Sequence, residues 1–599
     1  MLRALVLCVL SLVAAAAAAT RLERVAATRA WLRARAALVP GHRGGDRYLG
    51  SDGCRGCHPA AWRSWHGSYH RTMTQPASRA TVLPPWSDTT LPGGIALGFD
   101  GAAPVVVREG AHGRTRQAVA MLTGSHHLQL FWLHDPGTDT LQAFEYAWLV
   151  DEARFVPNVA TLVQPPGLDP IYTWNRICIR CHAVAGSPGW HEATGRVDTR
   201  VVELGIACEA CHGPARAHAE HHRDPVRRWL ARGVPDDIVQ PASLSPQAAT
   251  EICAQCHSIS LDRDEVGWLA HGPDHAPPDA LAGWTELVQH PARSGAPSAA
   301  LARVLLDDPE FLAQRFWPDG MVRVTGRETN ALQASRCAAP AEPARTISCL
   351  SCHSLHHGSR DDQLRPQARG DQACTQCHDD PALTQPGHSH HAADSEGARC
   401  MNCHMPHTAW GLLGAIRSHE IDTPDPEPAT ASGRPLACTL CHIDRPAAWA
   451  QRWLLRWRGE PGADPQAATG PADAVAGLLA GEAGVRALWA WHLGWAPARV
   501  AGGERWQAAL LAEALLDPYP AVRAVAWRSL VQLLPDAPRL PDGVLPGAGE
   551  RAWALAAARA HAPDRSGDAV LRRGDGSLDD ARVRAWMAQR DPQPITLAE

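Results

Sequence analysis

Apolar, β-branched and aromatic residues gather in short runs between residues 104 and 163, with polar segments between them. The runs are PVVVRE (104–109), LQLFWL (128–133) and LQAFEYAWLV (141–150). Runs of this length and composition are typical of strands, and the turn-rich HDPGTDT between the second and third runs is typical of a hairpin. The pattern predicts a β-rich insertion at about residues 100–165.

A different pattern fills residues 446–599, where long apolar stretches repeat. AVAGLLAGEAGVRALWAWHL (474–493) resembles LAEALLDPYPAVRAVAWRSL (511–530), and the shared Val-Arg-Ala begins at Val485 and again at Val522, with a weaker echo at Val583. An offset near 40 residues is typical of HEAT-type helical repeats. An ordinary alanine-rich bundle is the alternative. Either way, the pattern predicts an all-helical domain that contains no cysteine and serves as a cap or docking platform.

The chain begins with one arginine followed by an apolar run from Ala4 to Ala19. Alanines at its end offer A-x-A cleavage sites, which is the layout of a secretory signal. Several arginines follow between residues 21 and 35, and positive charge there opposes translocation. We therefore interpret residues 1–20 as a signal peptide or an uncleaved N-terminal anchor. No other run approaches the ~20 apolar residues of a membrane span.

The cysteines form one repeated unit, Cys-x-x-Cys-His, which occurs eight times. A single copy could be a redox pair or half a zinc site, but neither explains a histidine directly behind every second cysteine. The unit is the attachment signal for c-type heme: both thiols form thioethers, and the histidine is the proximal iron ligand. In chain order, the eight motifs are Cys54, Cys57, His58; Cys178, Cys181, His182; Cys208, Cys211, His212; Cys253, Cys256, His257; Cys349, Cys352, His353; Cys374, Cys377, His378; Cys400, Cys403, His404; and Cys438, Cys441, His442.

These motifs predict a mainly α fold in three parts. Residues 1–20 are the leader, residues 21–445 form an octaheme cytochrome c domain of short helices and loops that includes the β-rich insertion, and residues 446–599 form the HEAT-like domain. Because heme attachment occurs on exported apoproteins, we expect a periplasmic or extracytoplasmic protein with eight hemes c.

Charge adds one exclusion. The formal charge is -5 and all 57 basic residues are arginine, since the chain contains no lysine. Each heme normally carries two propionates, so the holoprotein is more acidic than the sequence alone, and arginine must provide the compensation. A Cys-x-x-Cys-Lys site, the lysine-ligated catalytic heme of pentaheme nitrite reductases, is excluded.

A second iron ligand for each heme can come from the many histidines outside the motifs. His66 and His70 are four residues apart, on one helical face. Further candidates lie in the segment CEACHGPARAHAEHH, in the clusters GSHH, SLHH and GHSHH, and singly. The candidate distal ligands are His66, His70, His127, His191, His218, His356, His390, His391 and His419.

Several segments resemble a family of exported multiheme c-type cytochromes with C-terminal helical repeats. The family lies in the superfamily that includes the tetraheme electron acceptor of hydroxylamine oxidoreductase. The matching segments are CRGCHPAAWRSWHGSYH, TGSHH, TWNRICIRCH, ELGIACEACHGPARAH, FWPDG, HSHHAADSEGARCMNCHMPHTAWGLL, RSHEI and GRPLACTLCH. The resemblance implies distal ligands at His66, His127, His218, His390 or His391, and His419.

Two functions fit these features. One is electron transfer through eight six-coordinate hemes, between redox partner proteins that include a membrane-bound donor; we expect no nucleic-acid partner. The alternative is an oxidoreductase in which one heme keeps an open face and acts on a small nitrogen or sulfur compound. A structural or filament-forming cytochrome is also compatible with the sequence.

Overall fold

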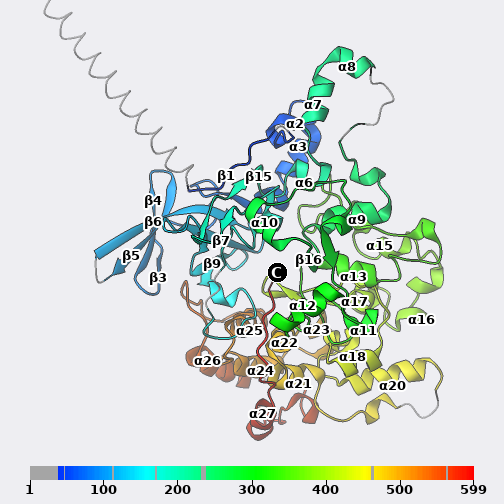
Figure 1. Cartoon of the computed structure of the whole chain (residues 1–599). Coiled ribbons are helices and arrows are strands. Elements are labelled where there is room, and N and C mark those ends of the chain that lie inside the picture. The colour runs from blue at the N-terminus through cyan, green and yellow to red at the C-terminus, as the bar shows by residue number, and fades with distance from the viewer. Residues whose placement is uncertain are drawn as a thin grey trace, which may run out of the picture.

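The computed structural model describes residues 38–45, 47–110, 113–168, 172–230, 236, 238–460, 464–560, 564–575 and 577–598. The predicted leader, residues 1–20, lies outside this range. The described chain is mixed, with substantial helix and some sheet. Figure 1 shows the sheet on one side, the cysteine-rich segments on the other, and the C-terminal helices beneath both. Within the described residues, no helix has the length and apolar character that crossing a membrane requires.

One antiparallel sheet of nine strands dominates the β structure and follows the strand-like runs of the sequence. Its main path is β10-β9-β7-β6-β5-β4-β3, with β2 beside β6 and β8 beside β7. The sheet begins at Thr74, ahead of the boundary expected near residue 100. The strands are β2 (Thr74–Pro76), β3 (Thr90–Leu91), β4 (Ile95–Asp100), β5 (Ala103–Gly110), β6 (Gly113–Thr123), β7 (Leu128–His134), β8 (Leu141–Ala143), β9 (Tyr146–Leu149) and β10 (Arg154–Pro157).

One face of the sheet buries an aromatic cluster. Trp86, Phe131, Phe144 and Phe155 are all at most 1% exposed, and Trp86 packs against Phe131 with ring centres 4.8 Å apart. Buried aromatic pairs of this kind contribute beyond their buried area. The sheet therefore has its own apolar core, which needs no cofactor to fill it.

The cysteine-rich region consists of short helices joined by loops and two-stranded ribbons. The ribbons pair β1 (Gly41–His42) with β14 (Arg200–Val201), β11 (Ala183–Val184) with β15 (Glu203–Leu204), β12 (Trp190–His191) with β13 (Arg196–Val197), β16 (Ser260–Asp262) with β17 (Thr285–Leu287), and β18 (Ala409–Gly411) with β19 (Gly414–Ile416). The helices are α2 (Ser51–Cys54), α3 (Pro59–His66), α4 (Tyr69–Thr72), α5 (Ile179–His182), α6 (Cys208–His212), α7 (Arg216–Arg223), α8 (Pro225–Leu230), α9 (Pro246–Ala254), α10 (Glu265–His271), α11 (Pro291–Ser294), α12 (Ala299–Asp307), α13 (Glu328–Ala334), α14 (Cys349–Cys352), α15 (Gln372–Thr375), α16 (Pro386–Ser389), α17 (Cys400–His404), α18 (Pro426–Ser432) and α19 (Ala437–Cys441).

The C-terminal segment is helical throughout its regular structure. The two related sequence stretches become the helix pairs α21–α22 and α24–α25, and α22 packs against α25. The helices are α20 (Ala447–Trp457), α21 (Asp473–Ala480), α22 (Ala483–His492), α23 (Ala496–Gly502), α24 (Gln507–Ala514), α25 (Pro520–Leu533), α26 (Ala548–Arg559) and α27 (Asp580–Met587).

The C-terminal helices share a core with the rest of the chain. The largest cluster of buried apolar residues joins α21, α22, α24 and α25 to strands β9 and β10 and to residues such as Trp317 and Trp410. An ion pair between Arg528 and Glu152 at 2.7 Å and a second pair, Arg323 with Glu482, cross the same boundary. Because this core is continuous, cutting the chain at residue 446 would expose a large apolar face. The expected cytochrome part and the expected cap thus differ in composition and in cofactor motifs, but they pack around one shared core.

We expect the buried ion pair between Arg486 and Asp517 to be essential for this helical core. Their side chains are 2% and 1% exposed, with the Arg486 Nε to Asp517 Oδ2 distance at 2.7 Å. Replacing Asp517 with Asn leaves a buried guanidinium without its counter-charge, which costs roughly 3–5 kcal/mol. Thermal unfolding followed by circular dichroism should show a clearly lower midpoint. Asp198→Asn, which removes one partner of an exposed Asp–Arg pair, is the control and should change little. Equal shifts in both variants would contradict this assignment.

Candidate heme sites

Each Cys-x-x-Cys-His motif forms about one turn of helix, which is why sequence spacing alone places three groups together. The backbone N–H of the motif histidine donates to the carbonyl of the first cysteine, at 2.9 Å for His58, His182 and His257. This hydrogen bond closes the turn and brings both thiols and the imidazole to the same side. None of the described cysteines forms a disulfide. The thiols are therefore available for thioether bonds.

Six of the eight motif histidines face a second histidine from another part of the chain. Their ring centres are 6.1–6.4 Å apart, and in five pairs the ring planes differ by only 11–27°. The pair His257 and His70 is tilted by 61°. The pairs are His58 with His218, His212 with His356, His257 with His70, His353 with His419, His404 with His388, and His442 with His391.

This separation fits one metal ion between each pair of imidazoles. Two nitrogens bound to opposite sides of a metal at about 2.0–2.1 Å put their ring centres roughly 6 Å apart. Imidazoles that pack directly on each other lie closer, as His126 and His127 do at 3.8 Å. The residues therefore fit an iron held from both sides, at the position where the two motif thiols could hold the surrounding heme.

The other ring nitrogen of these histidines is held by an acceptor. The Nδ1 atoms of His212, His353 and His404 lie 2.7 Å from the carbonyl oxygens of Val239, Asp362 and Asp422 respectively. A nitrogen that faces a carbonyl must carry the proton and donate it, so Nε2 keeps its lone pair. Such partners fix the tautomer and the orientation of a metal-binding imidazole.

Burial keeps several of these histidines neutral, and neutral imidazole is the form that binds metal. Burial lowers the pKa of His70, His182 and His442, each to about 4. Below the ordinary histidine pKa near 6.5, the unfolded chain binds protons that the folded chain refuses, so folding stability falls as the pH drops from about 6.5 towards 4. At neutral pH these imidazoles are therefore unprotonated, and protons do not compete with a metal ion for them.

The remaining predicted distal candidates have other surroundings. His66 packs on Trp62 with ring centres 4.4 Å apart, His127 on His126, and His390 on Trp457 at 3.9 Å. His191 is exposed in β12. His388, which belongs to the candidate cluster GHSHH but was not selected from it as a distal ligand, faces His404. Its only sequence signal was its place in the histidine-rich cluster GHSHH, where spacing does not indicate which ring faces a motif.

Two motif histidines lack such a partner. Among the described residues, no histidine ring lies opposite His182 or His378 at the separation that the six pairs share. His182 is only partly accessible, whereas His378 is exposed at the surface. The second and sixth motifs therefore differ from the others in the groups that can close the far side of an iron.

Cysteines of different motifs lie beside one another, which brings the motifs into one group. In four pairs the two thiols are near enough to shift each other's pKa: Cys54 with Cys208, Cys181 with Cys256, Cys253 with Cys349, and Cys374 with Cys400. Three further pairs are close enough for their charges to interact: Cys211 with Cys253, Cys352 with Cys377, and Cys403 with Cys438. The eight motifs thus form one series of neighbours, and the fourth motif lies beside the second, the third and the fifth.

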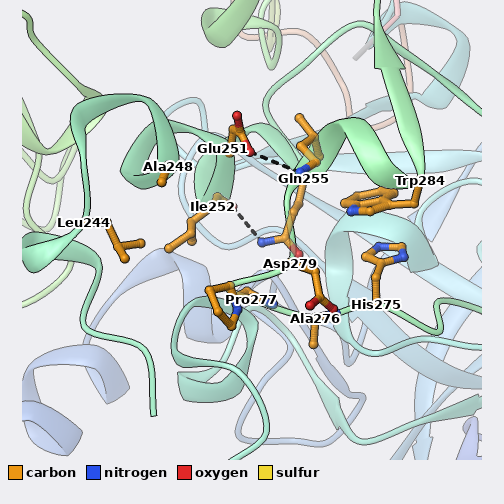
Figure 2. Close-up of a pocket in the computed structure, with 12 residues that line it drawn as sticks. Leu244, Ala248, Glu251, Ile252, Gln255, His275, Ala276, Pro277, Asp279 and Trp284 are labelled. Atoms are coloured by element: carbon orange, nitrogen blue, oxygen red, sulfur yellow. Dashed lines mark hydrogen bonds between the residues drawn. The ribbon is translucent and has the colours of Figure 1, made fainter. Parts of the chain in front are cut away.

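A small pocket lies beside the fourth motif, between α9 and the loop at residues 275–284, with about 350 Å³ of empty space. Figure 2 shows His275 packed on Trp284 and the acidic side chains at its edge. Glu251 accepts from the backbone N–H of Leu281 and Asp279 from that of Ala276. These two carboxylates therefore hold the loop that lines the pocket.

Comparisons with known proteins agree with the motifs. A family model described as a doubled CXXCH motif matches residues 342–383, which contain the fifth and sixth motifs. No curated protein matches the chain.

Three solved cytochromes are distantly similar in structure. The crystal structure of the outer cell wall cytochrome OcwA is 15% identical, with 81% of this chain and 100% of that chain covered and a TM-score of 0.47. An undecaheme cytochrome from the S-layer of Carboxydothermus ferrireducens is 15% identical, with 83% and 70% covered and a TM-score of 0.33. The octaheme sulfite reductase MccA of Wolinella succinogenes is 16% identical, with 65% and 60% covered and a TM-score of 0.28. These likenesses are too distant to indicate a function.

The doubled motif and the attachment turns establish the chemical class. The chain is a multiheme c-type cytochrome and binds heme c through its Cys-x-x-Cys-His motifs.

We expect His419→Ala to open one coordination position, because His419 faces His353 of the fifth motif. Loss of this imidazole lets water reach one iron while the others keep their ligands. A high-spin signal should appear in the ferric absorption and electron paramagnetic resonance spectra, at about one-eighth of the total heme. His390→Ala removes a neighbouring-cluster histidine that packs on Trp457, and this control should keep the wild-type spectra. A spectrum of His419→Ala without new high-spin heme would exclude His419 as a ligand.

Proposed function

We propose that the protein is an electron carrier that passes single electrons along eight covalently bound hemes c. The observation that carries the proposal is the set of six histidine pairs, since a heme with imidazole on both faces has no room for a substrate. Bound heme supplies one-electron exchange between ferric and ferrous iron. The chain supplies the ligands, their orientation and the spacing between sites.

The proximity of motif cysteines supports a continuous path. A sulfur that forms a thioether lies at the edge of its heme, so neighbouring sulfurs of two motifs favour two heme edges that are close. The neighbouring cysteines support the order first, third, fourth, fifth, sixth, seventh and eighth, with the second motif as a branch on the fourth. Electrons can then enter at one end of the molecule and leave at the other.

The residues around the ligand pairs support electron transfer rather than chemistry on a substrate. Carbonyl acceptors hold the Nδ1 atoms of His212, His353 and His404, so these rings keep their orientation when the iron changes oxidation state. The C-terminal helices share a core with the cytochrome part, which restrains the protein around the sites. Rigid ligands favour fast transfer because little has to rearrange.

The location and the partners extend the proposal. The leader-like N-terminus supports an exported protein in the periplasm or on the outer face, with an anchor if the leader is retained. The recurring helix pairs α21–α22 and α24–α25 support a short HEAT-like array. We propose that this helical part serves as a cap or docking platform for the redox partners, a membrane-bound donor among them.

A second function follows from the two motif histidines, His182 and His378, that no imidazole of the described part of the chain faces. An open iron at His182 or His378 would make the protein an oxidoreductase for a small nitrogen or sulfur compound, with the other hemes as its electron supply. His182 is the stronger candidate, because it is shielded from solvent whereas His378 is exposed. Shielding favours controlled access of a small substrate.

Two measurements on the purified exported protein test these proposals. Intact mass should exceed the apoprotein mass by eight hemes, because every motif is complete. Carbon monoxide added to the reduced protein should bind at most two hemes per chain, because six irons are closed by histidine pairs. Binding of three or more would contradict the ligand pairs. No binding would support a carrier alone, whereas one or two molecules bound, together with reoxidation of the reduced protein by nitrite, hydroxylamine or sulfite, would support the second function.

A further inference from the structure

The proximal histidine of the fourth motif has an unusual hydrogen-bond partner. His257 Nδ1 lies 2.9 Å from Glu328 Oε2. In the third, fifth and seventh motifs, the corresponding atom faces a main-chain carbonyl instead. A carboxylate is the stronger acceptor, because a hydrogen bond to an ionised group is roughly twice as strong as a neutral one.

The surrounding residues hold the Glu328 carboxylate in place. Its other oxygen accepts from the backbone N–H of Gly326 at 2.8 Å and from the Thr325 hydroxyl at 3.3 Å. Glu328 is also the first residue of α13, where the helix dipole favours a negative charge. The Thr329 backbone N–H donates to the His257 carbonyl at 3.0 Å and so docks the start of this helix on the motif. Within the described residues, no arginine forms an ion pair with Glu328. Of the two side chains that donate to this carboxylate, the Thr325 hydroxyl and the His257 imidazole, only His257 can also bind a metal.

We propose that Glu328 lowers the reduction potential of the heme that His257 binds, and thereby sets the potential at the junction of the electron path. A carboxylate that draws on the Nδ1 proton makes the imidazole a stronger donor, which stabilises ferric over ferrous iron. The position matters because cysteines of the fourth motif lie beside cysteines of the second, third and fifth motifs. Electrons then reside on the neighbouring hemes rather than at the branch. The inference rests on the proposed role of His257 as an iron ligand.

A second carboxylate provides an internal comparison. His218 Nδ1 lies 2.8 Å from Asp236 Oδ2, but the same oxygen is 2.8 Å from His222 Nε2, and the Asp236 side chain is 35% exposed. Glu328 is 22% exposed and serves one histidine. Sharing and solvent screening weaken the influence of Asp236 on its imidazole. We expect the effect on potential to be larger at the fourth motif than at the first.

The test is a spectroelectrochemical titration of the complete holoprotein. Glu328→Gln keeps the size of the side chain and removes its charge. One titrating component should move to higher potential, with its ferrous-to-ferric ratio at a fixed applied potential raised roughly tenfold, while the other components stay in place. Glu251→Gln is the matched control, since Glu251 lies on the helix that carries Cys253 but accepts from a backbone amide. It should move no component by a comparable amount.

A second variant tests the mechanism by the sign of its effect. Thr325→Val removes one donor to the carboxylate and preserves the side-chain shape, so Glu328 accepts more fully from His257. The same component should move to lower potential, by less than the shift of Glu328→Gln. An upward shift in both variants, or no shift in Glu328→Gln, would overturn the inference. If Glu328→Gln contains less heme than the unmodified protein, the shift measured in Thr325→Val decides the test.

His257→Met distinguishes a failure of the inference from a failure of the proposed ligation. Thioether ligation raises the potential of a heme, so this variant identifies the component that belongs to the fourth motif. If that component moves in His257→Met but not in Glu328→Gln, the tuning role fails and the ligand role stands. If neither variant moves a component, the ligand assignment of His257 fails as well.

Discussion

The structure depends on pairs of imidazoles held opposite each other at a distance that suits one iron. Each motif histidine is placed by its own turn of helix, but its partner comes from a distant segment, as with His58 and His218 or His353 and His419. A ligand bond across such a gap would join segments that are distant in the chain. Covalent attachment at the cysteines would strengthen that link. The short helices of the cysteine-rich region thus serve as a scaffold for cofactors, beside the apolar clusters that the region forms by itself.

The sheet and the C-terminal helices are stabilised in a different way from the cysteine-rich region. Both have apolar cores that are filled by side chains, such as Trp86 and Phe131 in the sheet and the buried helices α22 and α25. They flank the cysteine-rich region, whose regular structure consists of short helices and two-stranded ribbons. The C-terminal helices even bury an ion pair, Arg486 with Asp517. A buried ion pair is tolerated only where both charges are well matched.

The eight motifs differ in the groups around their histidines, and these differences bear on the choice between electron transfer and catalysis. In six motifs a second imidazole faces the motif histidine, and the hydrogen-bond partners of the motif histidines range from carbonyl oxygens to the Glu328 carboxylate. Such variation in hydrogen bonding allows one ligand type to span several potentials. Among the described residues, no histidine faces the second or the sixth motif, and these are the positions at which a vacant iron would give the molecule a reaction of its own. The branch from the fourth motif to the second connects that position to the rest of the path.

The sequence by itself determined the chemistry of attachment and the proximal ligands, because both depend on residues within one helical turn. It also indicated the strands near residues 104–150 and the helical C-terminus, where periodic apolar positions reflect local structure. The partner of each motif histidine was decided by the tertiary structure. His66, His127 and His390 had the same local signal as His70, His388 and His391, yet the rings of the first three pack on aromatic side chains while the other three face a motif. Ligand pairing is a long-range contact, so it depends on how loops are brought together rather than on the spacing within any of them. The same holds for the Glu328 contact with His257 and for the core shared between the C-terminal helices and the sheet, since neither leaves a periodic trace in the chain.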